Sequence, residues 1–190
     1  LFGPGMPGAA QLAMGSSGSD ALIVDLEDST PFELRAQARD GLQALLASWR
    51  EAGIITSVRI NALESDGYLD LAAAMKAGAQ VIVYPMTETA EQIRALDTAI
   101  TDWEKQLSLH TGSTPILPVC ETALGVADVR LIAAAIRRVR AALMGTEDLA
   151  TNLCAERTHE GDELDHARRR FILECRAARI EPIDAPYTYG

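Results

Sequence analysis

Positive charge is scarce in this chain of 190 residues. Asp and Glu outnumber Lys and Arg by 27 to 17, which gives a formal net charge of −10 at pH 7. A protein that binds nucleic acid or an anionic membrane surface normally shows the opposite balance, so we expect neither partner. Aromatic residues make up only 5% of the chain, too few for a platform on which single-stranded bases stack.

Long apolar runs and paired cysteine motifs are also absent. No stretch approaches the ~20 apolar residues that a membrane span needs. The three cysteines, Cys120, Cys154 and Cys175, form no CxxC motif. An odd number without that spacing fits neither a disulfide framework nor a zinc knuckle, and it predicts a reducing, cytoplasmic location. The chain begins without Met or a signal-type stretch and stops at Gly190, so we expect both ends to be trimmed.

Short apolar runs alternate with helix-length amphipathic segments along the chain. Near-continuous Val, Ile and Leu runs are typical of strands that are buried on both faces of a parallel sheet. The expected strands are a stub at residues 1–2 and the runs 21–26, 56–61, 80–85, 115–121, 141–145 and 180–184. The expected helices are 8–15, 31–52, 67–77, 87–109, 123–138 and 160–179.

This alternation predicts a parallel sheet with helical crossovers, either an open doubly wound sheet or a (β/α)8 barrel. The first βα turn, residues 3–8, carries two prolines and lacks GxGxxG, so the dinucleotide-binding fingerprint fails. Seven strand candidates leave a barrel one strand short. We therefore predict an α/β fold, a single TIM-barrel domain over residues 1–190 that lacks the last strand and the C-terminal lid.

Charged and polar residues gather where the expected strands end. They are Asp25, Glu27, Asp28, Arg59, Asn61, Glu121, Thr146, Glu147, Asp148 and Asp184. In a barrel all these ends converge on one rim, where such enzymes place their active sites. Carboxylates from several strands around one arginine indicate a site for a hard cation with an anionic ligand.

A single acid after a strand is often only a helix cap or a first-turn acid that the helix dipole stabilises. Asp28 and Asp148 each fit that simpler interpretation. Glu121 does not, because it directly ends the apolar run 116–120. A carboxylate buried there would carry a desolvation penalty unless it is paired or binds a metal.

The ligand types favour magnesium. The three histidines lie away from the strand ends and form no HxH or HExxH motif, so zinc is not expected. Oxygen ligands suit Mg²⁺, with Mn²⁺ as a close substitute. The only lysines, Lys76 and Lys105, fall on expected outer helices, which argues against an imine-forming aldolase. The remaining mechanism stabilises an enolate with a metal and Arg59.

Six motifs then occur in order along the chain. They are Leu1-Phe2-Gly3-Pro4-Gly5, Asp25-Leu26-Glu27-Asp28-Ser29, Val58-Arg59-Ile60-Asn61, Glu121-Thr122-Ala123-Leu124-Gly125-Val126, Gly145-Thr146-Glu147-Asp148-Leu149 and Pro182-Ile183-Asp184. Together they resemble the HpcH/HpaI aldolase superfamily, in its citrate lyase beta-subunit-like branch, over nearly the whole chain.

The resemblance implies a Mg²⁺-dependent TIM-barrel lyase that reversibly cleaves a C–C bond of a 3-hydroxy-acyl-CoA, such as citryl-, malyl- or citramalyl-CoA, and forms homo-oligomers such as trimers or hexamers. It also implies a role for each site residue. Glu121 and Asp148 bind the metal, and Arg59 steadies the keto-acid oxygens. The backbone amides of Gly145, Thr146 and Glu147 receive the substrate carboxylate, and Glu27 and Asp28 line the site and orient metal-bound water.

The chain also departs from the family pattern. Met86 stands where the family usually has a lysine, and Met6-Pro7-Gly8 stands where an arginine usually follows Pro-Gly. Both changes remove positive charge from the expected rim and bear on CoA binding. The family's lid acid falls beyond Gly190. Two alternatives therefore stay open: an acyl-CoA thioesterase on the same scaffold, and a non-catalytic subunit that binds acyl-CoA.

Overall fold

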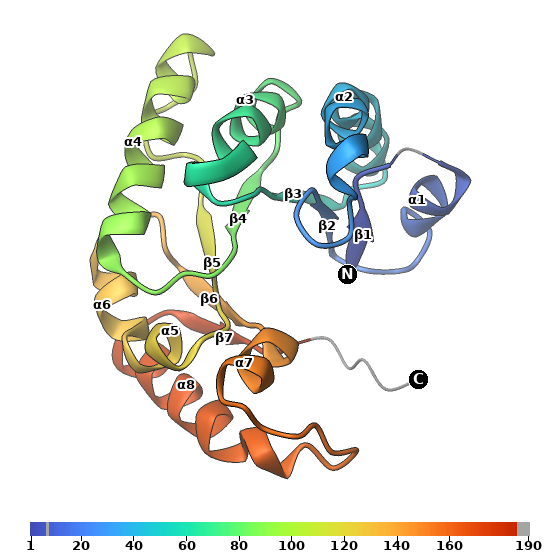
Figure 1. Cartoon of the computed structure of the whole chain (residues 1–190). Coiled ribbons are helices and arrows are strands. Elements are labelled where there is room, and N and C mark those ends of the chain that lie inside the picture. Colours follow the sequence, from blue (N-terminus) through green and yellow to red (C-terminus); the bar gives the residue numbers. More distant parts are fainter. Residues whose placement is uncertain (7, 186–190) are drawn as a thin grey trace. The chain divides into compact units, whose positions relative to one another are not determined.

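The structure, a computed structural model, describes residues 1–6 and 8–185 (Figure 1). Pro7, one of the departures noted in the first turn, lies outside the described residues. Two compact units divide the chain. The first comprises Leu1–Val83 and Ala99–Pro115, and the second comprises Tyr84–Thr98 and the residues from Ile116 onward. The single domain over residues 1–190 stays a prediction.

The strands of the first unit are parallel and neighbour one another in chain order. They are β1 (Phe2–Pro4), β2 (Ala21–Asp25), β3 (Ile55–Arg59) and β4 (Val81–Tyr84), the last of which ends in the second unit. Leu22, Val24, Val58 and Ile82 have no exposed surface, as expected of strands covered on both faces. The expected strands in this part of the chain are therefore confirmed to within two residues.

Helices connect these strands. They are α1 (Ala9–Met14), the short turn η1 (Phe32–Leu34) leading into α2 (Arg35–Glu51), and η2 (Leu63–Gly67) leading into α3 (Tyr68–Lys76). Every buried residue of α2 recurs at steps of one, three or four, namely Ala38, Leu42, Leu45, Leu46 and Trp49. This apolar stripe packs toward the core, as the sequence predicts. Figure 1 shows α2 and α3 side by side.

The second unit contains β5 (Ile116–Cys120), β6 (Ala141–Met144) and β7 (Glu181–Ile183), which also pair in parallel and in chain order. Its helices include α5 (Ala123–Ala127), α6 (Val129–Ala134), α7 (Thr146–Asn152), and η3 (Asp162–Leu164) leading into α8 (Asp165–Ala177). In Figure 1, α5 and α6 lie beside α8. Helix α4 (Ala90–Gln106) contributes residues to both units.

Two helical predictions need correction in this unit. The single helix expected over 123–138 is two helices, because Asp128 leaves helical geometry at φ −106° and ψ 12°. Helix α7 is not among the expected helices, since its seven residues are few and mostly polar, although the interpretation of Asp148 as a cap or first-turn acid agrees with it. Asp148 therefore lies in the first turn of a helix.

Seven described strands that alternate with helices confirm the α/β prediction. Seven is one fewer than the eight strands of a closed (β/α)8 barrel. None of the described helices combines the length and apolar character that crossing a membrane would need.

Candidate functional site

Arg59 is the centre of a charge cluster in the first unit. It ends β3, directly opposite Asp25 at the end of the neighbouring β2. Its Nε donates to Asp25 Oδ1 at 2.7 Å, and its Nη2 donates to Asp25 Oδ2 at 2.6 Å. Asp25 is fully buried and the Arg59 side chain is 10% exposed. This two-pronged geometry fixes the plane of the guanidinium.

Glu27 and Asp28 also contact that guanidinium, at its Nη atoms. Nη1 of Arg59 lies 2.9 Å from Glu27 Oε2, and Nη2 lies 3.2 Å from Asp28 Oδ2. These two carboxylates are more exposed than Asp25, at 21% and 61%. An incoming anion would therefore meet Arg59 at the edge that Glu27 and Asp28 now cover, while Asp25 holds the other edge.

The ionisation of Asp25 and Arg59 is mutually reinforced. Burial by itself would raise the pKa of Asp25, but the hydrogen bonds and charge of Arg59, together with Ser29, outweigh it and lower that pKa below its ordinary value. Burial would likewise lower the pKa of Arg59, but Asp25, Glu27 and Asp28 raise it overall. Both groups are therefore charged at neutral pH.

The loop that carries Glu27 and Asp28 is folded around the Asp25 carboxylate. Oδ1 accepts from the backbone N–H of Glu27 at 3.1 Å, and Oδ2 accepts from that of Ser29 at 2.9 Å. Thr30 donates its hydroxyl to the Asp25 carbonyl and accepts from the N–H of Gly5 at 2.8 Å. Asp25 thus shapes the loop and also anchors the arginine.

In the second unit, the buried charged residue at a strand end is Glu121. It follows β5 immediately and is 3% exposed, as the sequence predicts. Gly145 follows the adjacent β6, and a Cβ built on it would lie 2.3 Å from Glu121 Oε2 and 2.6 Å from Glu121 Cβ. Only glycine leaves room for this carboxylate. The requirement is steric, because the φ of Gly145, −96°, is open to any residue.

The backbone at Met86 is bent toward Glu121. Its N–H donates to Glu121 Oε1 at 2.7 Å, and its φ is 44°, in the left-handed region that non-glycine residues rarely adopt. Strained backbone of this kind is concentrated at functional sites. The Met86 side chain is 42% exposed. The residue at position 86 therefore binds Glu121 through its backbone amide, a contact that does not depend on the side chain.

Asp148 is exposed in the first turn of α7. The backbone N–H of Gly145 donates to the Cys120 carbonyl at 3.2 Å, so this amide is already engaged. The amides of Thr146 and Glu147 lie in the first helical turn, where N–H groups have no acceptor within the helix. Arg157 braces the turn, since its Nη1 donates to the Thr146 carbonyl at 3.2 Å.

Glu121 and Asp148 fit a magnesium ion by donor type. Mg²⁺ is commonly held by one or two protein carboxylates, with waters and substrate oxygens completing its shell. No three His, Cys, Asp or Glu side chains of residues 1–6 and 8–185 are grouped so as to hold a metal by themselves. The described carboxylates thus suit a cation that keeps solvent or substrate ligands, and not a closed all-protein site.

The structure brings the predicted residues together in two sets. Arg59, Glu27 and Asp28 form the first, and Glu121 with the Gly145 turn forms the second. The sequence places Asp25 among the strand-end acids of the rim, and its place opposite Arg59 follows once strand pairing is known. Arg157 is a contributor that the sequence analysis does not name. Nothing in the sequence pattern distinguishes Arg157 from the other arginines.

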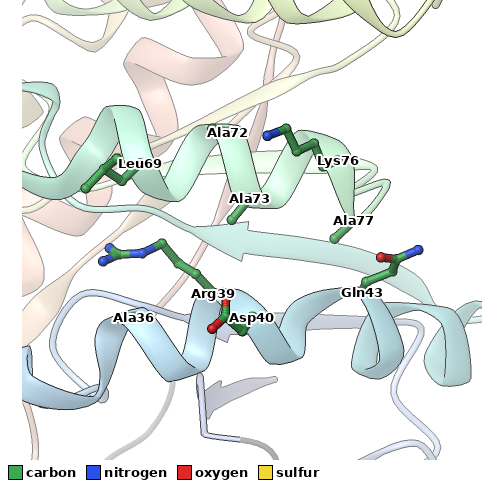
Figure 2. A pocket seen from close by; sticks show the side chains of 9 residues that line it. All are labelled: Ala36, Arg39, Asp40, Gln43, Leu69, Ala72, Ala73, Lys76 and Ala77. Atoms are coloured by element: carbon green, nitrogen blue, oxygen red, sulfur yellow. The ribbon is translucent and has the colours of Figure 1, made fainter.

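A groove of about 440 Å³ lies between α2 and α3 (Figure 2). Its walls include Arg39 and Gln43 of α2, and Leu69 and Lys76 of α3. It contains none of the predicted site residues. The charged strand ends, and not this groove, therefore define the candidate site.

Comparison with known proteins gives a consistent result. A family model for HpcH/HpaI aldolase/citrate lyase matches residues 1–189. Citrate lyase subunit beta of Escherichia coli (strain K12) is 36% identical over 193 residues, which cover 99% of this chain and 63% of that protein. An L-malyl-CoA/beta-methylmalyl-CoA lyase of Cereibacter sphaeroides (strain ATCC 17025 / ATH 2.4.3) is 30% identical over 208 residues, covering 98% and 65%. The chain thus spans somewhat less than two thirds of these curated relatives.

Solved structures resemble the chain as well. A citrate lyase beta subunit from M. tuberculosis, complexed with oxaloacetate and magnesium, is 26% identical and has a TM-score of 0.77 over 99% of this chain and 78% of that one. The malate synthase of Haloferax volcanii reaches a TM-score of 0.83 at 18% identity, over 98% of this chain and 58% of that one. The second likeness concerns the fold alone.

Proposed function

Because the chain belongs to the HpcH/HpaI aldolase/citrate lyase family, we propose that it acts as a Mg²⁺-dependent C–C lyase on a 3-hydroxy-acyl-CoA of the citryl-, malyl- or citramalyl-CoA type. Mn²⁺ is the expected substitute cation. The relatives named citrate lyase subunit beta and malyl-CoA lyase support this reaction class. The observation that carries the proposal is Glu121, a carboxylate 3% exposed at the end of a strand, with a glycine and a bent backbone accommodating it.

We assign the metal to Glu121 and Asp148. A divalent cation bound there would supply positive charge to the oxygens of a keto or hydroxy acid and so lower the energy of an enolate. Met86 donates its amide to Oε1 of Glu121 and thereby sets the direction of that carboxylate. The amides of Thr146 and Glu147 are proposed to receive the substrate carboxylate; Gly145 contributes chiefly by leaving space for Glu121.

We assign to Arg59 the binding of the keto-acid oxygens. In the cleavage direction the substrate hydroxyl loses its proton, and the C–C bond breaks to leave a keto acid and an acyl-CoA enolate, which then takes up a proton. The cationic guanidinium stabilises negative charge on the keto-acid oxygen. Asp25 keeps Arg59 charged and in plane, and Glu27 and Asp28 give way to the substrate and orient water in the site.

Incubation with malyl-CoA and Mg²⁺ tests the reaction. A lyase releases glyoxylate and acetyl-CoA, and the Glu121→Gln variant should lose that activity together with Mn²⁺ binding measured by calorimetry. Glu91→Gln, a matched loss of one exposed carboxylate on α4, should keep both the activity and Mn²⁺ binding. Release of free malate would identify a thioesterase on the same scaffold. A folded chain with neither turnover nor cation binding would favour the non-catalytic acyl-CoA-binding subunit.

Two further features extend the proposal. Homo-oligomers, trimers or hexamers, are proposed from the family resemblance, and sedimentation velocity would measure their size. A cytoplasmic location is proposed because Cys120, Cys154 and Cys175 are all free thiols, which is the usual state of cysteine in a reducing compartment.

A further inference from the structure

A buried carboxylate of α3, Asp70, lies outside the residues assigned above. It has no exposed surface. Its Oδ2 accepts from both the backbone N–H of Asn61, at 2.9 Å, and the side-chain Nδ2 of Asn61, at 2.7 Å. Its Oδ1 accepts from Arg39 Nη1 at 2.8 Å. Three N–H donors therefore compensate for the burial of this charge.

Asn61 carries the contact onward to the loop of Glu27 and Asp28. Its Nδ2 also donates to the carbonyl of Leu26 at 2.9 Å, while the N–H of Leu26 donates to the Arg59 carbonyl at 3.0 Å. Leu26 is thus held on both sides by residues at and beyond the end of β3. It lies between Asp25, which anchors Arg59, and Glu27, which covers the opposite edge of the guanidinium.

Asp70 determines how Asn61 is oriented. Because a carboxylate only accepts hydrogen bonds, it selects the amide nitrogen of Asn61 and not the oxygen. The same nitrogen then has its second hydrogen directed to Leu26. Arg39 completes the arrangement from α2, and Figure 2 shows its side chain extending into the groove between α2 and α3.

We propose that Asp70 is a positioning residue: through Asn61 it fixes the loop that presents Glu27 and Asp28 to Arg59. Its consequence for catalysis rests on the proposed function, since Arg59 is assigned there to the keto-acid oxygens. Asp70 itself touches no substrate. Its loss releases the Leu26 carbonyl and loosens the loop, so that Glu27 and Asp28 no longer constrain the Nη atoms of the guanidinium, which Asp25 alone then holds.

The experiment compares Asp70→Ala with Asp70→Asn and with a matched control, Asp66→Ala. Asp66 also lies near Arg39, at 3.5 Å, and near Arg35, at 3.6 Å. It is partly exposed and lies in η2, just before α3. Its removal deletes the same charge beside the same arginine. Asp70→Asn keeps one acceptor oxygen for Asn61 and should restore much of what Asp70→Ala loses.

The first measurement does not depend on turnover. In Asp70→Ala, amide exchange at Glu27 and Ser29 should be faster by about tenfold, because these N–H groups lose protection when the loop opens locally. The Nε–H resonance of Arg59 should shift or broaden. Asp66→Ala should leave both signals as in the unaltered chain. If Asp70→Ala does not fold, Asn61→Ala removes the same link to Leu26 and carries the same expectation.

The second measurement follows the condensation direction, with glyoxylate, acetyl-CoA and Mg²⁺ as probes. Asp70→Ala should raise the KM for glyoxylate by about tenfold, the scale expected for a small misplacement of a binding group. The KM for acetyl-CoA should stay unchanged. Unaltered exchange and an unaltered Arg59 signal in folded Asp70→Ala would overturn the positioning role. Absence of turnover in the unaltered chain would instead refute the lyase assignment, and the exchange data would still decide the role of Asp70.

Discussion

Asp25 and Arg59 face each other across β2 and β3, and two hydrogen bonds of 2.7 and 2.6 Å join the carboxylate to the guanidinium. The pair uses the Nε–Nη2 edge of the arginine. Nη1 contacts Glu27, and Nη2 also contacts Asp28; the side chains of these two acids reach solvent. One edge of Arg59 is therefore structural, and the other is available for exchange with an anion.

Replacing Asp25 with Asn should destabilise the chain at pH 7. It removes the charge that balances a buried guanidinium, and breaking such a pair from one side lowers the free energy of unfolding by on the order of 3 kcal/mol. Urea denaturation provides the measurement. Asp28→Asn is the control, because a partly exposed ion pair contributes less than about 1 kcal/mol. Equal losses in both variants would contradict the separation of structural and exchangeable edges.

The Asp25 contribution should also depend on pH. The pKa of Asp25 is lower in the folded chain than its ordinary value of 3.8. An acid whose folded pKa is depressed stabilises the fold above its unfolded pKa, and this stabilisation is lost as the pH falls through the folded pKa. The difference in unfolding free energy between the unaltered chain and Asp25→Asn should thus be constant above about pH 5 and shrink below about pH 4. A difference that grows on acidification would have the wrong sign.

Gly145→Ala should disturb Glu121. The added methyl group would overlap the Glu121 side chain, and forcing extra atoms into a packed site typically destabilises by about 1–3 kcal/mol. Mn²⁺ affinity should fall along with stability, because Glu121 must move. Gly53→Ala is the comparison: Gly53 has open space around it and a φ of 78°, so its substitution strains the backbone without touching the site. Calorimetry should show unchanged Mn²⁺ binding for Gly53→Ala, and the same result for Gly145→Ala would refute the steric argument.

The three cysteines should react at very different rates. Cys154 is exposed, whereas Cys120 and Cys175 are buried. Burial raises the pKa of both buried thiols, so little reactive thiolate forms and reagents have poor access. Iodoacetamide at pH 8 should modify Cys154 first, as peptide mass spectrometry would reveal, and all three should react in urea. Rapid native modification of Cys120 would show that β5 is less well covered than described.

The fold was largely predictable because strands buried on both faces leave a clear trace in the sequence. The apolar runs at 21–26 and 116–120 predict buried strands, and β2 and β5 lie there. Breaks within helices leave a weaker trace in the sequence. Asp128 is compatible with a helix by composition, so the break between α5 and α6 is set by tertiary packing, which a local pattern does not record.

The candidate site was predictable as a set of residues but not as a set of contacts. Glu121 was distinguished by its apolar neighbours, and its burial is confirmed. Asp25 has similar apolar neighbours, yet its role depends on register with Arg59, which involves residues 34 positions apart. The function of Asp70 was equally hidden, because a charged residue in a helix is ordinarily assigned to the solvent face.

Glu121 and Gly145 also constrain how this sequence can change. Since no Cβ fits at position 145 while a glutamate occupies position 121, the two positions cannot vary independently. A related chain that gains a side chain at 145 must shorten or redirect the acid at 121, and with it the proposed metal ligand. The pair thus gives a sequence criterion for relatives: Glu with Gly marks chains that can place the acid as it lies here, and a chain with a side chain at 145 must place it differently.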